Sequence, residues 1–430
     1  MDGDVWGLGD VLAEAEDASP VESVDVVARN LQKRFGATCV SFLFLDLIGE
    51  ELVRLTTVDG AESGHGESRI GLRGSVYEKV LRSQRLHVEP DGDEDHRVIS
   101  PVTNRGDCVG VLEMTLPSAD EAVLRQVSEA AHALAYIIVT DRRFTDLYHC
   151  GRRTTPTSLA AEIQHQLLPS AACCEAAQFA VAGGLVPADD IGGDTYDYAL
   201  DRDTLHVSIT DAMGHDTESA LLATLLLGAL RGARRVGCDI AEQARRAHRA
   251  LLHHDRGIAT GQLLRIRLDD GSAQLVNAGH PRPLRLRDGV VEELPIFANL
   301  PFGVASPVDY RVQEVDLRPG DRLIMLTDGM QERTAAEVDL AALVRDSGDF
   351  HPRETVRALV TAVREACRGH LQDDATVLCL DWYGTHRTSR HTDAEEAEAF
   401  ATRLGGVQRT LPRGLSATGG SSGAGRRPPS

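Results

Sequence analysis

The feature that most constrains this chain is a set of apolar, β-rich runs bordered by aspartate, with glycine close by. ITDAMGH (209–215) and IMLTDGM (324–330) end in such acids, IGGDTYD (191–197) follows an apolar stretch, and QDDATVLCL (372–380) begins with two acids. Strands of this kind can gather carboxylates at one edge of a sheet, and glycine lets the backbone approach a ligand closely. Each segment alone is weak evidence, and the Asp-Gly of IMLTDGM is first of all a turn signal.

Carboxylates crowded at one edge repel one another, which raises their pKa values unless cations balance the charge. All-oxygen ligation suits Mg²⁺ or Mn²⁺ better than Zn²⁺. The acidic segments together therefore favour a metal site over a series of unrelated turns. Within 209–222, Asp216 and Thr217 stand where a helix N-cap is needed and Glu218 suits the helix dipole, so this part is expected to be structural. His215 taken alone is expected to be a positioned or exposed histidine, not a ligand.

The composition excludes several classes of partner. A formal net charge of −20 over 430 residues disfavours nucleic acid and anionic membranes, which both attract concentrated positive charge. The N-terminus lacks the basic-then-apolar pattern of a secretion signal, and no apolar run reaches the roughly 20 residues of a spanning helix. The eight cysteines form no CxxC pair and are expected to be reduced thiols. We therefore expect a soluble, cytoplasmic protein with no nucleic-acid and no membrane partner.

The hydrophobic patterns divide the chain into five parts. We expect an N-terminal extension (1–19), an α/β unit (20–140), a helical linker (141–174), a larger domain (175–383) and a mostly disordered tail rich in Gly, Ser, Pro and Arg (384–430). In the larger domain, runs of strands with helices between them predict an α+β fold. The helical pattern from Asp120 to Leu168 is almost unbroken except near Pro156, and it predicts a rigid connector or the seam of a homodimer.

The order of the segments in the larger domain resembles the PPM-type (type 2C) metal-dependent protein serine/threonine phosphatases of the SpoIIE-like bacterial branch. The resemblance covers residues 162–380 and rests on EIQHQLLPS, LVPADDIGGDTYDY, ITDAMGHDTESALLATLL, LVNAGHPRPLRLRDG, LPFGV, RPGDRLIMLTDGMQER and DDATVLCL. It implies a sandwich of two antiparallel β-sheets flanked by helices, with two Mn²⁺ or Mg²⁺ ions at one end.

The resemblance also implies roles for particular residues. Asp194 and Asp211 would be the catalytic, metal-binding acids, with Asp211 the bridge between the ions. Ala212 would offer its backbone carbonyl, and Asp328 and Asp373 would complete the second metal. Asp374 would have a supporting role, and His280 in NAGHPRP would be structural or near the site, with a simple turn as the equal alternative.

Two residues depart from the pattern of many relatives, which have glycine at the positions of Ala212 and Asp216. A carbonyl ligand survives at Ala212 only if the local φ is negative, since alanine is strained at positive φ. Asp216 adds a negative charge that could alter metal affinity. All the core acids are present, which favours an active enzyme over a pseudophosphatase.

The implied activity is hydrolysis of phosphoserine or phosphothreonine, on a phosphorylated anti-sigma-factor antagonist of the STAS type. Two alternatives stay open: an inactive phosphatase-like interaction module, and a metal hydrolase of small phosphate esters. The 20–140 unit resembles a GAF domain through its order of elements and its closing strand and helix, VGVLEMTLPSADEAVLRQV. That resemblance implies a sensory or dimerising module that regulates the phosphatase through the 120–168 helix.

Overall fold

The computed structural model describes residues 8–46, 49–59, 69–92, 94–148, 158–188, 192–214, 216–254, 257–304, 308–331, 338–368 and 371–385. Residues 1–391 form one compact unit. The predictions for His215, for Pro156 and for the tail beyond residue 385 lie outside the described residues.

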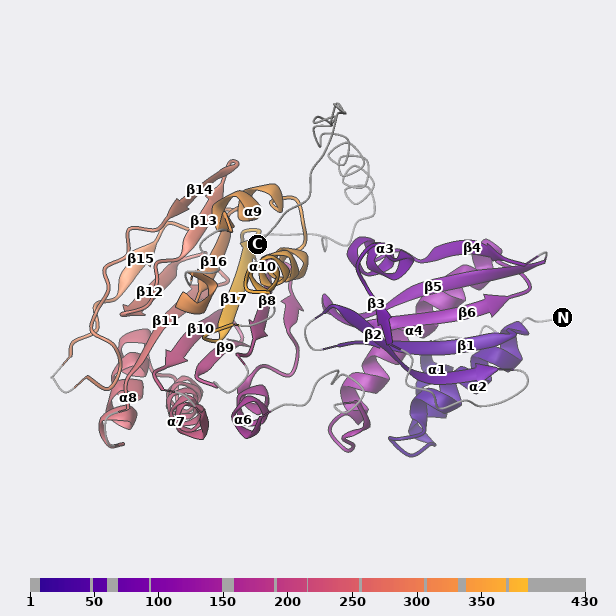
Figure 1. Cartoon of the computed structure of the whole chain (residues 1–430), viewed down its shortest axis with the longest axis horizontal. Coiled ribbons are helices and arrows are strands. Elements are labelled where there is room, and N and C mark those ends of the chain that lie inside the picture. The colour runs from indigo at the N-terminus through magenta and orange to yellow at the C-terminus, as the bar shows by residue number, and fades with distance from the viewer. Residues whose placement is uncertain are drawn as a thin grey trace, which may run out of the picture. The chain divides into compact units, whose positions relative to one another are not determined.

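The first part of the chain builds a six-stranded antiparallel sheet in the order β3-β2-β1-β6-β5-β4 (Figure 1). Its strands are β1 Cys39–Leu45, β2 Glu51–Asp59, β3 Arg69–Gly71, β4 His87–Asp91, β5 Asp95–Asn104 and β6 Asp107–Leu116. Helices α1 (Leu8–Glu16), α2 (Ser23–Phe35) and α4 (Glu121–Asp141) pack on one face, and α3 (Val76–Ser83) packs on the other. Alternation along β1 sends Phe42 to the first face and Leu43 to the second.

Two details of this part bear on the sequence predictions. The expected helix before Gly36 is α2, and Gly36 ends it in the left-handed conformation (φ 63°), as predicted for a C-cap. The segment before residue 20, expected to be an extension, contributes α1. Val11 and Ala15 of α1 are buried in the same core as α2 and α4, so this segment adds to the sheet domain.

The connector differs from the nearly continuous helix that the sequence predicted. Helix α4 ends at Asp141 and residues 142–144 form a turn, and the next complete helix of the described residues is α6 (Leu159–Leu167). After this turn, the Thr145 hydroxyl accepts a hydrogen bond from the Leu147 amide at 3.1 Å, the bond of a helix N-cap, and residues 147 and 148 are helical again. Ser158 then caps α6 by accepting from the Ala161 amide at 3.1 Å.

The second part forms two antiparallel sheets, as expected for the sandwich. The five-stranded sheet has the order β15-β12-β11-β10-β9, and the six-stranded sheet has the order β14-β13-β16-β17-β8-β7. The strands are β7 Cys173–Glu175, β8 Phe179–Val186, β9 Asp194–Leu200, β10 Thr204–Ala212, β11 Ala259–Arg267, β12 Ala273–Ala278, β13 Leu284–Arg287, β14 Val290–Glu293, β15 Gln313–Val315, β16 Arg322–Leu326 and β17 Ala375–Trp382.

Helices cover the outer face of each sheet (Figure 1). Helices α7 (Asp216–Arg235) and α8 (Ile240–Leu252) pack on the five-stranded sheet, and α9 (Leu340–Asp346) and α10 (Pro352–Ala366) pack on the six-stranded sheet. Between the sheets, Ile209 and Leu264 of one meet Met325 and Leu378 of the other in a single apolar core. The two sheets are therefore held face to face, and the ends of their strands share one edge.

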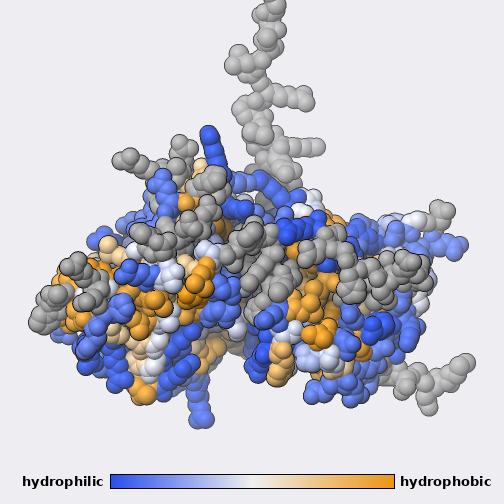
Figure 2. Space-filling model, turned by 60° about the horizontal axis from the view of Figure 1, so that its bottom comes forward, coloured by the Kyte–Doolittle hydropathy of each residue, from blue (hydrophilic) through white to orange (hydrophobic). Residues whose placement is uncertain are grey.

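The outer surface agrees with the acidic, charged composition. In the view of Figure 2, hydrophilic residues dominate and hydrophobic residues gather only in limited patches. Among the described residues, the most exposed large apolar side chains are those of Phe144 (72%), Val236 (67%) and Leu159 (65%), which lie far apart in the chain. Scattered apolar exposure of this kind is normal for a globular protein. In the described ranges, every helix is too short or too polar to cross a membrane.

Candidate metal centre

The predicted acids Asp194 and Asp211 are direct cross-strand partners in the five-stranded sheet. Asp194 begins β9 and Asp211 lies near the end of β10, and their Cα atoms are paired in the antiparallel register. Side chains of directly opposed residues leave the sheet on the same face, with Cβ atoms about 5 Å apart. Asp194 is buried at 2% exposure and Asp211 is partly buried. The hairpin therefore holds the two acids together at the strand ends.

The other two predicted acids come from the six-stranded sheet. Asp328 begins a short 3₁₀ helix, η1 (Asp328–Gln331), directly after β16, and Asp373 lies just before β17. β16 and β17 are antiparallel neighbours, so the end of one and the start of the other share an edge. A Cβ atom at Gly329 would lie 2.0 Å from the Asp374 carbonyl oxygen. The glycine of TDG is therefore required for η1 to approach this strand.

Hydrogen bonds to Asp194 join the two sheets at this edge. The hydroxyls of Thr327 and Thr376 donate to Oδ2 of Asp194 at 2.7 Å and 2.6 Å. Both threonines belong to the six-stranded side, whereas Asp194 belongs to β9. The carboxylate is thus fixed in orientation, because bonds from two directions restrict its rotation.

Asp374 is engaged in bonds that fit the predicted supporting role. Its Oδ1 accepts from the Ala188 amide at 2.8 Å, and its Oδ2 accepts from Nε2 of Gln164 at 2.6 Å. Gln164 Nε2 also donates to the Asp194 carbonyl at 2.8 Å, so this side chain of α6 contacts both acids. No sequence pattern singled out Gln164 as an individual residue. It lies within the segment EIQHQLLPS, but its partner Asp374 is 210 positions away, and no local pattern marks such a contact.

Ala212 satisfies the backbone condition set by the sequence analysis. It ends β10, and positive φ outside glycine occurs, among the described residues, at Gln84, Arg105, Asp288 and Arg368. The Ala212 amide donates to the Gly193 carbonyl at 3.1 Å, and a Cβ atom at Gly193 would lie 2.3 Å from the Ala212 oxygen. Glycine at 193 therefore allows the Ala212 carbonyl to approach the backbone before Asp194, and alanine at 212 is not strained.

Burial, and after it the charges of neighbouring carboxylates, raise the pKa values of these acids. Burial, and then the charges of Asp328, Asp373 and Asp374, raise the pKa of Asp211 to about 7. Burial raises the pKa of Asp194 well above its ordinary value, and the charges of Asp211 and Asp374 raise it further. Burial also raises the pKa of Asp374 to about 6, although the Ala188 amide, Gln164 and the Asp194 amide lower it in part.

The charges around Asp211 indicate whether these residues suit divalent cations. The charges that shift the pKa of Asp211 are all carboxylates, and none of them is an arginine or a lysine. Uncompensated carboxylates of this kind favour cations, and their all-oxygen donor set suits Mg²⁺ or Mn²⁺. Within the described ranges, no three His, Cys, Asp or Glu side chains converge closely enough to enclose an ion. The oxygen donors and the negative charge of these acids therefore suit two divalent ions, although no three of the described acidic side chains converge on one point.

The family comparison covers Asp211, Asp328 and Asp373 of this site, whereas Asp194 lies just before the matched range. Residues 201–383 match the sequence profile of the family described as Stage II sporulation protein E (SpoIIE). This match identifies a SpoIIE-type, PP2C-like phosphatase domain in the second half of the chain.

The chain is similar to two proteins of Bacillus subtilis (strain 168). It is 24% identical over 192 residues to the phosphoserine phosphatase RsbP, covering 43% of this chain and 47% of RsbP. It is 21% identical over 234 residues to the phosphoserine phosphatase RsbU, covering 52% of this chain and 68% of RsbU.

Among solved structures, the chain resembles the PP2C phosphatase domain with a fragment of the regulatory domain of SpoIIE from Bacillus subtilis. The TM-score is 0.41 at 16% identity, and the match covers 71% of this chain and 86% of that one.

Proposed function

We propose that this protein is a metal-dependent protein serine/threonine phosphatase. Asp194 and Asp211 would act as the catalytic acids, and two Mn²⁺ or Mg²⁺ ions would be held by Asp194, Asp211, the Ala212 carbonyl, Asp328 and Asp373. The observation that carries the proposal is that acids from two sheets lie at one edge of the sandwich, where burial and then their mutual charges raise their pKa values. Bound divalent cations would relieve this repulsion and stabilise the ionised acids.

The described residues give each acid a distinct task. Bound divalent ions would neutralise phosphoryl oxygens and lower the pKa of an attacking water. Asp194 is oriented by Thr327 and Thr376, whereas Asp374 has both oxygens engaged by Ala188 and Gln164 and would serve as support.

Three buried cysteines of the described chain are poorly suited to act as phosphatase nucleophiles. Burial raises the pKa of the thiols of Cys108, Cys173 and Cys379, which makes them poor nucleophiles at neutral pH. The acids of the candidate centre therefore provide the better explanation for hydrolysis.

For the substrate, we propose a phosphoserine or phosphothreonine on an anti-sigma-factor antagonist of the STAS type. The support is the similarity to RsbP and RsbU, both named phosphoserine phosphatases. The chain covers about half of RsbP, so the activity and partner of the whole protein are part of the proposal.

The test is phosphate release by the metal-free protein before and after addition of Mn²⁺. The substrates are p-nitrophenyl phosphate, a phosphoserine STAS protein and small metabolite phosphate esters, and the variants are Asp211→Asn and Asp328→Asn. We expect Mn²⁺-dependent release from the phosphoprotein that both substitutions abolish. Mn²⁺ binding without turnover would instead support an inactive interaction module. Turnover of metabolite esters but not phosphoproteins would support a small-ester hydrolase.

We further propose that the GAF-like domain regulates the phosphatase through the connector. The supporting contact is that of Gln164, which extends from α6 at the end of the connector to Asp374 and to the Asp194 backbone. A movement of α6 would therefore change the bonds around two acids. Proline or charge-reversing substitutions in α4 that left both activity and its regulation unchanged would contradict this route.

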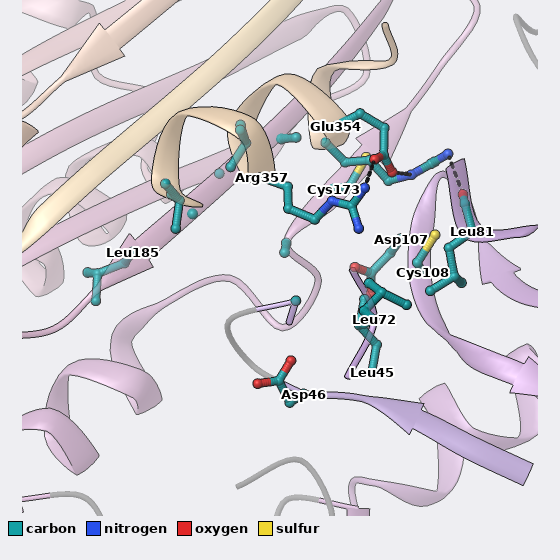
Figure 3. Close-up of a pocket in the computed structure, with 18 residues that line it drawn as sticks. Leu45, Asp46, Leu72, Leu81, Asp107, Cys108, Cys173, Leu185, Glu354 and Arg357 are labelled. Atoms are coloured by element: carbon teal, nitrogen blue, oxygen red, sulfur yellow. Dashed lines mark hydrogen bonds and ion pairs between the residues drawn. The ribbon is translucent and has the colours of Figure 1, made fainter. Parts of the chain in front are cut away.

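Contacts of α10 offer a second physical route for the same regulation. The Arg353 guanidinium donates to the Gly106 carbonyl at 3.0 Å and to the Leu81 carbonyl at 3.4 Å. Cys108 and Cys173 line the pocket beside it, which Figure 3 shows together with Leu81 and residues of α10. Helix α10 packs on β8 and β17, and β17 directly follows Asp374.

A homodimer through the connector is part of the proposal and is tested by the mass of the protein in solution.

A further inference from the structure

His280 occupies a position that the proposed function does not use. It follows β12 and is 4% exposed. Its main chain is locked by Asn277, whose side chain accepts from the His280 amide at 2.8 Å and donates to the His280 carbonyl at 2.9 Å. These bonds make the predicted turn between strands, but they involve only the backbone of His280. They leave open why an imidazole is buried there.

The imidazole connects the two halves of the candidate metal centre. On one side, its Nδ1 is 2.8 Å from the Thr260 hydroxyl, and Thr260 is the direct cross-strand partner of Asp211 on β11. On the other side, the backbone of Leu326, the last residue of β16, lies close enough to raise the pKa of the ring, without a hydrogen bond of standard geometry to Nε2. The next residue, Thr327, donates to Asp194. The ring thus lies between the five-stranded and the six-stranded sheet, beside the strands that carry the acids.

The two interactions of the ring differ in quality. The contact with Thr260 is a well-formed hydrogen bond, whereas Nε2 has no hydrogen-bond partner of standard geometry in the described part of the chain. Burial lowers the pKa of His280 to about 3, and the Leu326 backbone raises it only in part. The ring is therefore neutral at physiological pH and serves as a spacer with a polar end toward each sheet.

We propose that His280 is a positioning residue that holds the two sheets in register at the acidic edge and thereby sets the affinity of the site for divalent ions. This inference rests on the proposed function. The acids that would share the ions come from both sheets, so a small shift of one sheet changes the fit of the whole ligand set. Thr260, which contacts the ring, is the cross-strand partner of Asp211. Leu326, on the other side of the ring, precedes Asp328 by two positions in the chain.

The test compares His280→Gln with His248→Gln. His248 is a matched control in the same domain, because it is 5% exposed and its Nδ1 accepts from the Gly303 amide and bonds the Tyr310 hydroxyl. Three quantities are measured for each protein: the dissociation constant for Mn²⁺ by electron paramagnetic resonance of the free ion, the melting temperature, and kcat and KM with p-nitrophenyl phosphate.

We expect His280→Gln to weaken Mn²⁺ binding by about tenfold, the effect of one buried hydrogen bond, and to lower kcat while KM for the ester stays unchanged. His248→Gln should lower the melting temperature but leave Mn²⁺ affinity within about twofold of the wild type. His280→Asn, whose amide can take the place of Nδ1 toward Thr260, should recover part of the lost affinity. If His280→Gln fails to fold, Thr260→Val removes the same bond from its other partner and should weaken Mn²⁺ binding in the same way.

The possible failures are distinguishable. Equal Mn²⁺ affinity in the two glutamine variants, with an active wild type, would overturn the positioning role alone. A wild type that neither binds Mn²⁺ nor releases phosphate would overturn the proposed function and the inference with it.

Discussion

Replacing Asp211 with asparagine should make the metal-free protein more stable while it removes the response to metal. The pKa of Asp211 rises from 3.8 to about 7 on folding, because burial and the charges of Asp328, Asp373 and Asp374 disfavour its ionised form. A shift of about three pH units corresponds to at most about 4 kcal/mol of lost stability at pH 8. Because the acids titrate together and share this cost, we expect asparagine to recover about 2–4 kcal/mol.

The sign of the effect depends on pH. A carboxyl with a raised pKa is neutral in both states well below pH 4 and carries its full penalty only above the folded pKa. The gain from Asp211→Asn should therefore be largest near pH 8 and shrink as the pH falls toward 5. For a domain of this size, a gain of 2–4 kcal/mol raises the melting temperature by roughly 5–15 °C.

The assay is thermal unfolding of EDTA-treated protein at pH 8 and pH 5, followed by the same measurement with excess Mn²⁺. With metal at about 100 times its dissociation constant, the wild type should gain about 2.7 kcal/mol and the variant should gain far less. Asp309→Asn is the control, since the side chain of Asp309 is 97% exposed. A metal-free Asp211→Asn protein that is less stable than the wild type at pH 8 would refute the reasoning.

Three further predictions follow from the same edge of the sandwich. Mn²⁺ should bind more weakly as the pH falls from 8 to 6, because Asp211, with a pKa of about 7, must lose its proton to act as a ligand. A Mn²⁺ affinity that calorimetry finds independent of pH would contradict this prediction. Gln164→Ala leaves the buried Asp374 without its 2.6 Å donor and should destabilise the protein by about 1–3 kcal/mol in urea unfolding and reduce turnover; unchanged values in both would argue against the contact. Gly329→Ala places a Cβ atom 2.0 Å from the Asp374 carbonyl and should reduce Mn²⁺ affinity at least tenfold, whereas wild-type affinity would mean that η1 can move away freely.

Strands with apolar runs were predictable from the sequence, and those that depend on tertiary context were not. The runs at 204–211 and 375–382 match β10 and β17, because continuous β-branched and apolar residues signal a buried strand. In contrast, β9 (Asp194–Leu200) has the mixed sequence DTYDYAL and is formed by pairing with β10. The connector was predicted as a longer helix than α4, because helical periodicity does not reveal the turn at 142–144, where the amides of Arg143 and Phe144 bond the carbonyls of Thr140 and Asp141.

The acids of the candidate centre were found in the sequence because each one borders a strand or a turn with glycine. Two of these glycines have a clear structural reason. Gly193 lies against the Ala212 carbonyl, and Gly329 lies against the Asp374 carbonyl. Gln164 and the two-sided contacts of His280 were not predictable in this way, since they join segments far apart in the chain. The GAF resemblance of the first sheet and the metal-binding roles of the acids stay predictions.

The most direct test of the central claim is phosphate release from a phosphoserine STAS protein by the metal-free chain, measured before and after addition of Mn²⁺. The account predicts no release without metal, release with Mn²⁺, and loss of that release in Asp328→Asn, whose acid comes from the opposite sheet to Asp211. Equal release by the wild type and by Asp328→Asn, or release that persists in EDTA, would contradict a metal-dependent phosphatase centred on these acids.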